Sequence, residues 1–125
     1  MQTVLLVDDE VGLVNAVSRA LEDAGYRVLA AYDGRSALQM LASEPVDLLL
    51  SDIVMPGLFG TDVIRIARES MGLGHVPVIL MSVIGEDRVR ELFPLGDATF
   101  LPKPFTLSDV TGAVQSVLAR PRPQD

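Results

Sequence analysis

The spacing of hydrophobic positions changes repeatedly along the chain. Short apolar runs are typical of buried strands, and we expect strands at Thr3–Val7, Arg27–Ala31, Val46–Ser51, Val76–Met81 and Ala98–Leu101. Between these runs, apolar residues recur every three or four positions, as they do along one face of a helix. This alternation predicts an α/β fold, in which a parallel sheet of these five strands carries helices on both faces.

Several residues mark where the predicted helices begin and end. Gly25 is expected to follow the last turn of the first helix, where glycine is common. Thr61 is a good N-cap for a helix at Asp62–Ser70. Thr106 and Asp109 have the spacing of a capping box, in which each side chain accepts a hydrogen bond from the other residue's amide. They predict the start of the last helix.

Composition narrows the class of protein. The 125 residues suffice for one core, and we expect one domain at residues 1–119, then a disordered tail or the start of a linker at residues 120–125. The chain has no cysteine, which excludes disulfides and thiol catalysis. A net charge of −7 opposes nucleic-acid binding and favours cationic partners or metal ions. No signal peptide or bilayer-length apolar run is visible, so we expect a cytoplasmic protein without a membrane partner.

Polar residues follow four of the five predicted strands. The first strand leads to Asp8 and Asp9, the third to Asp52, the fourth to Ser82 and the fifth to Lys103. The carboxyl ends of parallel strands meet at one edge of the sheet, where ligands of open α/β folds bind. The second strand brings no comparable residue, as expected of a strand at the side of the sheet.

This set of residues suits phosphoryl chemistry. Three carboxylates at one edge repel each other, and a hard divalent cation relieves the repulsion. Oxygen ligands favour Mg²⁺, with Mn²⁺ as a second candidate. The cation, the Lys103 ammonium and the Ser82 hydroxyl together suit the oxygens of a phosphoryl group, and Asp52 is then the nucleophile.

Each residue taken alone has an ordinary explanation. Asp8 and Asp9 precede a helix, where acidic residues complement the helix dipole. Lys103 lies between prolines and could be a solvated loop residue, and His75 reads as an exposed loop residue. The hypothesis therefore depends on the combination at one edge of the sheet.

The combination resembles the receiver domain of two-component response regulators, and is similar to the single-domain chemotaxis and sporulation regulators. The resemblance runs from about Thr3 to about Leu118. The motifs that carry it are Asp8-Asp9-Glu10, Ser51-Asp52-Ile53-Val54-Met55-Pro56-Gly57 with Gly60, Ser82, and Phe100-Leu101-Pro102-Lys103-Pro104-Phe105. It implies the flavodoxin-like strand order 2-1-3-4-5 and a signalling switch that catalyses only its own phosphorylation and dephosphorylation.

The resemblance also implies a role for each site residue. Asp52 resembles the phosphoacceptor, and Lys103 the lysine that contacts the phosphoryl group. Ser82 and Phe100 resemble the switch pair, a hydroxyl and an aromatic ring that turns inward. The implied Mg²⁺ ligands are Asp8 through water, Asp9, Asp52 and the backbone carbonyl of Val54. The implied partner is a histidine kinase or a histidine phosphotransfer protein.

Three apolar residues beside the site are expected to set the lifetime of the phosphoryl group, and one of them departs from the family's usual pattern. Val83 replaces a small residue and adds bulk near Ser82. Val54 and Ile84 occupy the positions two residues past Asp52 and Ser82, which flank the path of an attacking water. Because neither side chain can orient water, we expect slow self-dephosphorylation.

The output surface departs from the family as well. Pro94 is expected to stop or kink a helix at Glu86–Phe93. Ala113 and Gln115 stand where winged-helix regulators carry the arginines of a dimer interface. We therefore expect a monomer or a weak dimer that signals through its fourth helix, fifth strand and fifth helix, with no direct contact to nucleic acid.

Other functions remain as alternatives. An FMN carrier of the same fold needs a phosphate cradle where this chain has carboxylates. A phosphatase with an aspartate nucleophile needs a second aspartate at Val54. A pseudo-receiver, which acts by binding without phosphorylation, would have lost a site residue, and the chain retains all of them. The chain could also be the N-terminal receiver of a larger transcription factor.

Overall fold

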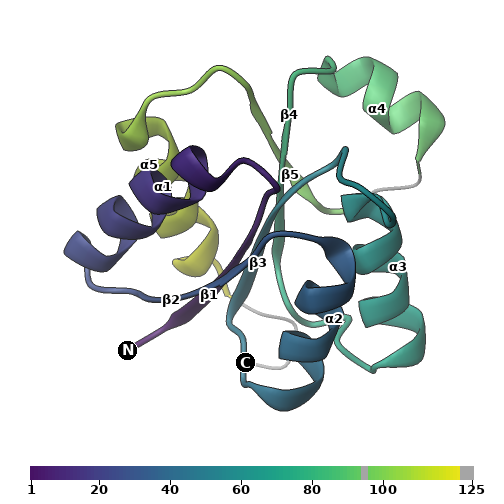
Figure 1. The fold of residues 1–125 in the computed structure, drawn as a ribbon, viewed down its shortest axis with the longest axis horizontal. Coiled ribbons are helices and arrows are strands. Elements are labelled where there is room, and N and C mark those ends of the chain that lie inside the picture. Colours follow the sequence, from purple (N-terminus) through teal and green to yellow (C-terminus); the bar gives the residue numbers. More distant parts are fainter. Residues whose placement is uncertain (94–95, 122–125) are drawn as a thin grey trace.

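The computed structural model describes residues 1–93 and 96–121 (Figure 1). The strands among these residues are β1 (Thr3–Val7), β2 (Arg27–Ala31), β3 (Leu48–Asp52), β4 (Val78–Ser82) and β5 (Thr99–Pro102). The helices are α1 (Val11–Asp23), α2 (Gly34–Ser43), α3 (Gly60–Ser70), α4 (Glu86–Leu92) and α5 (Leu107–Leu118). The alternation of strands and helices expected from the sequence is confirmed.

All strand pairs are parallel, and the order across the sheet is β2-β1-β3-β4-β5. This confirms the flavodoxin-like order and places β2 at one side of the sheet. In the register, Val7 pairs with Ser51, and Ser82 pairs with Pro102. The ends of the central strands are therefore level, so the residues that follow them lie at one edge.

The sheet separates two hydrophobic layers. Every residue of β1 is buried, and its side chains alternate between the layers. Val4 and Leu6 pack in the cluster that includes residues of α1 and α5, whereas Leu5 and Val7 pack in the cluster with α2 and α3. Figure 1 shows the same division, with α1 and α5 on one side of the sheet and α2 and α3 on the other.

Three expected strand starts were wrong. β3 begins at Leu48 and not at Val46. Just before the strand, the Asp47 amide donates to the Thr3 carbonyl, and the Asp47 carboxylate accepts a hydrogen bond from the Thr3 amide. A side chain thus takes the place of a backbone partner at this position. β4 begins at Val78 and not at Val76, whose amide bonds a loop carbonyl at Leu73. The strand expected at Ala98–Leu101 is likewise Thr99–Pro102.

The expected N-cap of α3 was also wrong. The helix begins at Gly60, and Phe59, not Thr61, is the N-cap residue. Other boundary predictions are confirmed. Gly25 follows α1 with a φ of 98°, a left-handed conformation that favours glycine. Thr106 and Asp109 form the expected capping box.

Two expectations concern parts of the chain that lie outside the described residues. The fourth helix ends at Leu92, and Phe93 is its C-cap, but Pro94 lies beyond the description. The same holds for residues 122–125 of the expected tail. Within the described ranges, no helix is both long and apolar enough to cross a membrane.

Candidate acidic site at the carboxyl edge of the sheet

Three carboxylates from two strand ends meet at the edge of the sheet. Asp8 and Asp9 follow β1, and Asp52 is the last residue of β3. One carboxylate oxygen of each lies within 4.8 Å of the others. Asp8 is buried, Asp52 is partly buried and Asp9 is exposed. The convergence expected from the sequence is therefore present, with one face open to solvent.

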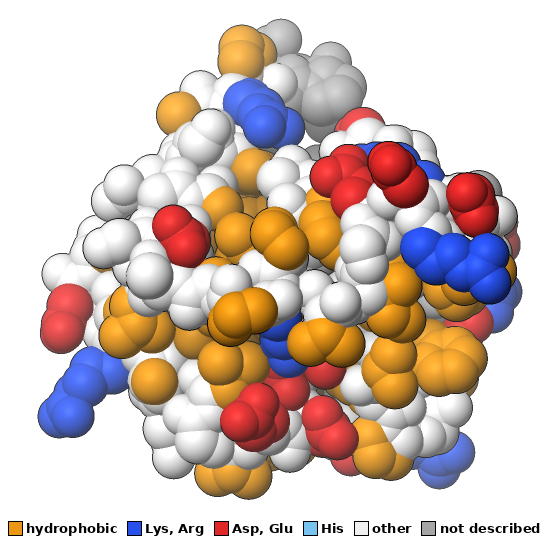
Figure 2. Space-filling view, turned by 90° about the horizontal axis from the view of Figure 1, so that it is seen from above, with side chains coloured by type: hydrophobic (Ala, Val, Ile, Leu, Met, Phe, Trp, Pro, Cys, Tyr) orange, Lys and Arg blue, Asp and Glu red, His pale blue; other side chains and the backbone are white. Residues whose placement is uncertain are grey.

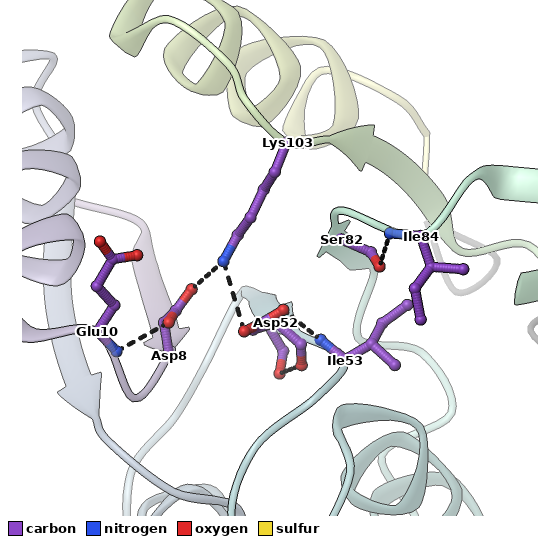
Figure 3. A network of polar contacts seen from close by, with 8 residues as sticks. Asp8, Glu10, Asp52, Ile53, Ser82, Ile84 and Lys103 are labelled. Atoms are coloured by element: carbon purple, nitrogen blue, oxygen red, sulfur yellow. Dashed lines mark hydrogen bonds and ion pairs between the residues drawn. The ribbon is translucent and has the colours of Figure 1, made fainter.

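Lys103 reaches this cluster from the segment after β5 (Figure 3). Its ammonium donates a hydrogen bond to Asp8 Oδ2 at 2.8 Å and lies 3.4 Å from Asp52 Oδ2. The backbone also fixes its position, because the Lys103 amide donates to the Ser82 carbonyl at 2.8 Å. The lysine thus bridges the ends of β1 and β3 from a segment tied to β4.

The backbone around Asp52 is held from several directions. The Ile53 amide donates to Asp52 Oδ1 at 2.8 Å, and the Ser51 hydroxyl donates to the Asp52 carbonyl at 2.8 Å. The Gly60 amide closes the following loop through a 2.7 Å hydrogen bond to the Ile53 carbonyl. A Cβ at Gly60 would lie only 2.0 Å from the Asp52 carbonyl oxygen. This close approach requires glycine at the start of α3.

Burial and the neighbouring charges shift the pKa values of two residues in the cluster, Asp52 and Lys103. Burial, followed by the charge of Asp8, raises the pKa of Asp52 above its ordinary value, and Lys103 only partly offsets the rise. Burial alone would lower the pKa of Lys103, but the hydrogen bond to Asp8 and the negative charges of Asp52 and Asp8 raise it overall. The lysine is therefore firmly protonated, whereas the ionised form of Asp52 is disfavoured by its burial and by the charge of Asp8.

The donor set fits a hard divalent cation. The three clustered residues offer only carboxylate oxygens, which are the ligands preferred by Mg²⁺. Asp8 is buried and is bonded through both oxygens, to the Glu10 amide and to Lys103, so the exposed Asp9 and the partly buried Asp52 are the more accessible ligands. Burial first and the charge of Asp8 second raise the pKa of Asp52, and a bound cation would stabilise its ionised form against both.

The two residues predicted to act as a switch, Ser82 and Phe100, lie on β4 and β5, the two strands that follow β3 across the sheet. Ser82, at the end of β4, is 2% exposed, and its hydroxyl accepts a hydrogen bond from the Ile84 amide at 2.9 Å. Phe100 lies on the neighbouring strand β5 and packs, partly buried, against the core layer of α2 and α3. Thus Ser82 is engaged with its own loop and Phe100 is only partly inserted.

Exposed apolar side chains follow the same strand ends. Val54 comes after β3, Val83 after β4 and Leu107 after β5, and all three are exposed. Figure 2 looks onto this edge and shows a recessed basic side chain with acidic ones beside it, surrounded by apolar side chains. The charged site therefore has an apolar rim.

Sequence reasoning missed the residues that support the site. Ser51 and Gly60 were noted only as parts of a motif, although they hold the backbone of Asp52. Glycine immediately before an apolar-periodic helix could have suggested a close approach to another backbone. No sequence signal pointed to the contact between the Phe59 and Phe93 rings, whose centroids are 6.5 Å apart.

Comparison with known proteins places this geometry in a family. Residues 4–115 match the family described as the response regulator receiver domain. The chain is 35% identical over 121 residues to the transcriptional regulatory protein CpxR of Escherichia coli, a match that covers 96% of this chain and 50% of CpxR. It is 36% identical over 126 residues to the response regulator MprA of Mycobacterium tuberculosis, covering 98% and 53%. The chain spans about half the length of these relatives.

Solved structures of response regulators and receiver domains have the same fold as this chain. The chemotaxis response regulator CheY4 of Vibrio cholerae is 30% identical and superimposes with a TM-score of 0.86 over 94% of this chain and 98% of CheY4. The receiver domain of sensor histidine kinase PA1611 from Pseudomonas aeruginosa is 27% identical, with a TM-score of 0.85 over 95% and 98%. That receiver was solved with a magnesium ion coordinated in its active site cleft.

Proposed function

Because the chain belongs to the response regulator receiver domain family, we propose that it is a phosphorylation-dependent switch of a two-component or phosphorelay system, with Asp52 as the phosphoacceptor. Receiver domains of this family act with histidine kinases and output partners and are signalling switches, not ordinary enzymes. The observation that carries the proposal is the position of the Lys103 ammonium between Asp8 and Asp52, beside the Asp9 carboxylate.

The reaction is a transfer between two nucleophiles. A carboxylate oxygen of Asp52 attacks the phosphorus of a phosphohistidine, the new oxygen–phosphorus bond forms and the nitrogen–phosphorus bond breaks. The electron pair of the broken bond stays on the ring nitrogen, the donor histidine, protonated on its other ring nitrogen, leaves as a neutral imidazole, and Asp52 becomes an acyl phosphate. The hydrogen bond from the Ile53 amide to Oδ1 fixes the rotation of the Asp52 carboxylate, so the attacking group is already oriented.

Receiver domains bind Mg²⁺ in an acidic pocket, and the carboxylates of this chain fit that ion. Asp9 and Asp52 would hold it directly, Asp8 through water, and the Val54 carbonyl would supply a further oxygen. The bound ion would balance the charge of the phosphoryl oxygens. Lys103 would also balance this charge by moving one of its hydrogen bonds from a carboxylate to a phosphoryl oxygen.

The signal would follow from Ser82 and Phe100. Ser82 now bonds the Ile84 amide, and a phosphoryl oxygen would compete for its hydroxyl. If the β4–α4 loop follows Ser82 inward, Phe100 gains space to turn deeper into the core beside it. The change would alter the surface of α4, β5 and α5, which would meet the output partner.

In a second candidate arrangement, this chain is the receiver part of a larger transcription factor. The specific observation is that CpxR and MprA match this chain over only about half of their length. In that arrangement the same switch would act on a domain of its own chain. The proposed chemistry at Asp52 is identical in both cases.

Intact-mass measurement tests the proposal. After incubation with Mg²⁺ and acetyl phosphate, we expect a mass gain of one phosphoryl group that EDTA prevents. Asp52→Asn should abolish the gain, whereas the control Asp97→Asn, on the exposed turn before β5, should leave it intact. A parent chain that gains no phosphoryl group from acetyl phosphate or from any phosphohistidine donor would instead be a pseudo-receiver.

A further inference from the structure

Phe59 occupies a position where its type is unusual. Helix N-caps are normally Ser, Thr, Asp or Asn, because their side chains accept a backbone hydrogen bond. Phe59 precedes α3 and cannot do this, and only the return bond of a capping box is made, from the Phe59 amide to Asp62 Oδ2. The residue is 44% exposed. Any contribution of this side chain therefore comes from its ring and not from a cap hydrogen bond.

The ring of Phe59 contacts the ring of Phe93, the C-cap residue of α4. The two centroids are 6.5 Å apart and the planes are inclined by 63°, an edge-to-face arrangement that aromatic pairs prefer. The contact joins segments that are far apart in sequence: the turn before α3 and the end of α4. No other aromatic pair is found in the described ranges of the chain.

Helix α4 has few other anchors. It has seven residues, and Val89 is its one buried residue. The guanidinium of Arg90 adds hydrogen bonds to the Ala98 and Gly96 carbonyls at 2.9 Å and 3.4 Å. A helix this short is unstable by itself, so its position depends on these few contacts, and the Phe93 ring is among them.

Phe59 is also connected to the acidic site, through the loop that precedes α3. Phe59 is bonded to Gly60, whose amide donates to the Ile53 carbonyl at 2.7 Å. The Ile53 amide in turn donates to Asp52 Oδ1 at 2.8 Å. The Phe59 ring, the loop at residues 53–60 and the Asp52 carboxylate are thus linked by consecutive short contacts, and Val54 lies in the same loop.

We propose that the Phe59–Phe93 contact couples the position of α4 to the acidic site, by a route separate from Ser82 and Phe100. Phe59 is a positioning residue: with its ring held by α4, the loop at residues 53–60 is kept in the form that presents Asp52 and the loop backbone to a cation. The coupling is reciprocal, so a cation that orders the loop also holds α4, and a partner that moves α4 changes cation affinity. The inference rests on the proposed function for its use in signalling.

A double-mutant cycle on Mg²⁺ affinity tests the coupling. Phe59→Leu and Phe93→Leu keep apolar bulk but remove the ring contact, and each should weaken Mg²⁺ binding by about two- to tenfold, the range set by the strength of an aromatic pair. The double variant should bind Mg²⁺ about as well as the single variant with the lower affinity, because both changes remove the same contact. Phe59→Tyr retains the ring and should bind like the parent. Isothermal titration calorimetry gives the constants.

Amide hydrogen exchange measures the coupling in unphosphorylated protein, so its result does not depend on phosphorylation. Adding Mg²⁺ should slow exchange of the α4 amides in the parent, and this effect should be lost in Phe59→Leu but retained in the control Tyr26→Leu, at the opposite edge of the sheet. Unchanged affinities, additive effects in the double variant, or an α4 unaffected by Mg²⁺ in the parent would each overturn the coupling. Asp52 phosphorylation of the parent, measured by mass, tests the proposed function separately.

Discussion

The ammonium of Lys103 donates to the buried carboxylate of Asp8 at 2.8 Å and lies 3.4 Å from Asp52. One positive charge thus pairs with two of the three clustered carboxylates, Asp8 and Asp52, and the third is Asp9. When all three are ionised, three negative charges and one positive charge leave a net charge of −2. A divalent cation balances that charge, and the site is organised for one before any phosphoryl donor arrives.

Removing the lysine should destabilise the metal-free protein. In Lys103→Met the buried Asp8 carboxylate loses its charged partner, and the free energy of unfolding should fall by about 2 kcal/mol. Urea unfolding in EDTA measures the change, and Mg²⁺ should restore more stability to the variant than to the parent. Arg27→Met is the control, because it breaks only the exposed 3.5 Å pair with Glu44 and should have little effect.

Neutralising Asp52 should stabilise the metal-free protein, in a pH-dependent way. Burial and Asp8 raise the folded pKa of Asp52 above its unfolded value of 3.8, so the protonated form favours folding. That contribution is present below pH 3.8 and is lost as the pH rises through the folded pKa. Asp52→Asn should therefore melt a few degrees above the parent at pH 7 in EDTA, with a difference that shrinks toward pH 3.8. A constant difference across this range would contradict the account.

The start of α3 should tolerate no side chain. Gly60→Ala places a Cβ 2.0 Å from the Asp52 carbonyl, so the helix or the strand end must move. We expect a loss of about 2–3 kcal/mol in unfolding free energy and weaker Mg²⁺ binding. Gly112→Ala is a matched control in α5, where a Cβ meets no atom within 4 Å, and it should stabilise the protein slightly. Equal effects of the two substitutions would argue against the close approach.

Much of this arrangement could be predicted from the sequence. Buried parallel strands are read from their apolar runs, and parallel order alone brings Asp8, Asp9 and Asp52 to one edge. The capping box at Thr106 was equally readable, because it depends on residues only three positions apart. These features follow from local pattern or from topology.

The remainder depends on contacts between distant segments. Thr61 has the better local propensity for an N-cap, yet the bond from Gly60 to the Ile53 carbonyl starts α3 earlier. The preference of Lys103 for Asp8 over Asp52 and the Phe59–Phe93 contact likewise join residues far apart in sequence. Periodicity carries no information on such pairings, which are decided when the layers pack.

The phosphoryl lifetime should depend on Val54. Its side chain is 53% exposed beside Asp52 and has no group to orient an attacking water, so we expect slow self-dephosphorylation. Val54→Asn supplies an amide and should shorten the lifetime by about tenfold. The decay of phosphorylated protein after removal of the donor gives the rate. Val11→Asn, a similarly exposed valine in α1, should not change it, and an unchanged or longer lifetime in Val54→Asn would refute the role.

The central claim is that Asp52 becomes an acyl phosphate. The most direct measurement is to trap the phosphorylated parent with borohydride, which reduces an aspartyl phosphate to homoserine, and to map the product by peptide mass spectrometry. We predict homoserine at position 52 alone, and only when Mg²⁺ and a phosphoryl donor are both present. Reduction at Asp8 or Asp9, or a phosphoryl group on a serine or threonine with position 52 unchanged, would contradict the account.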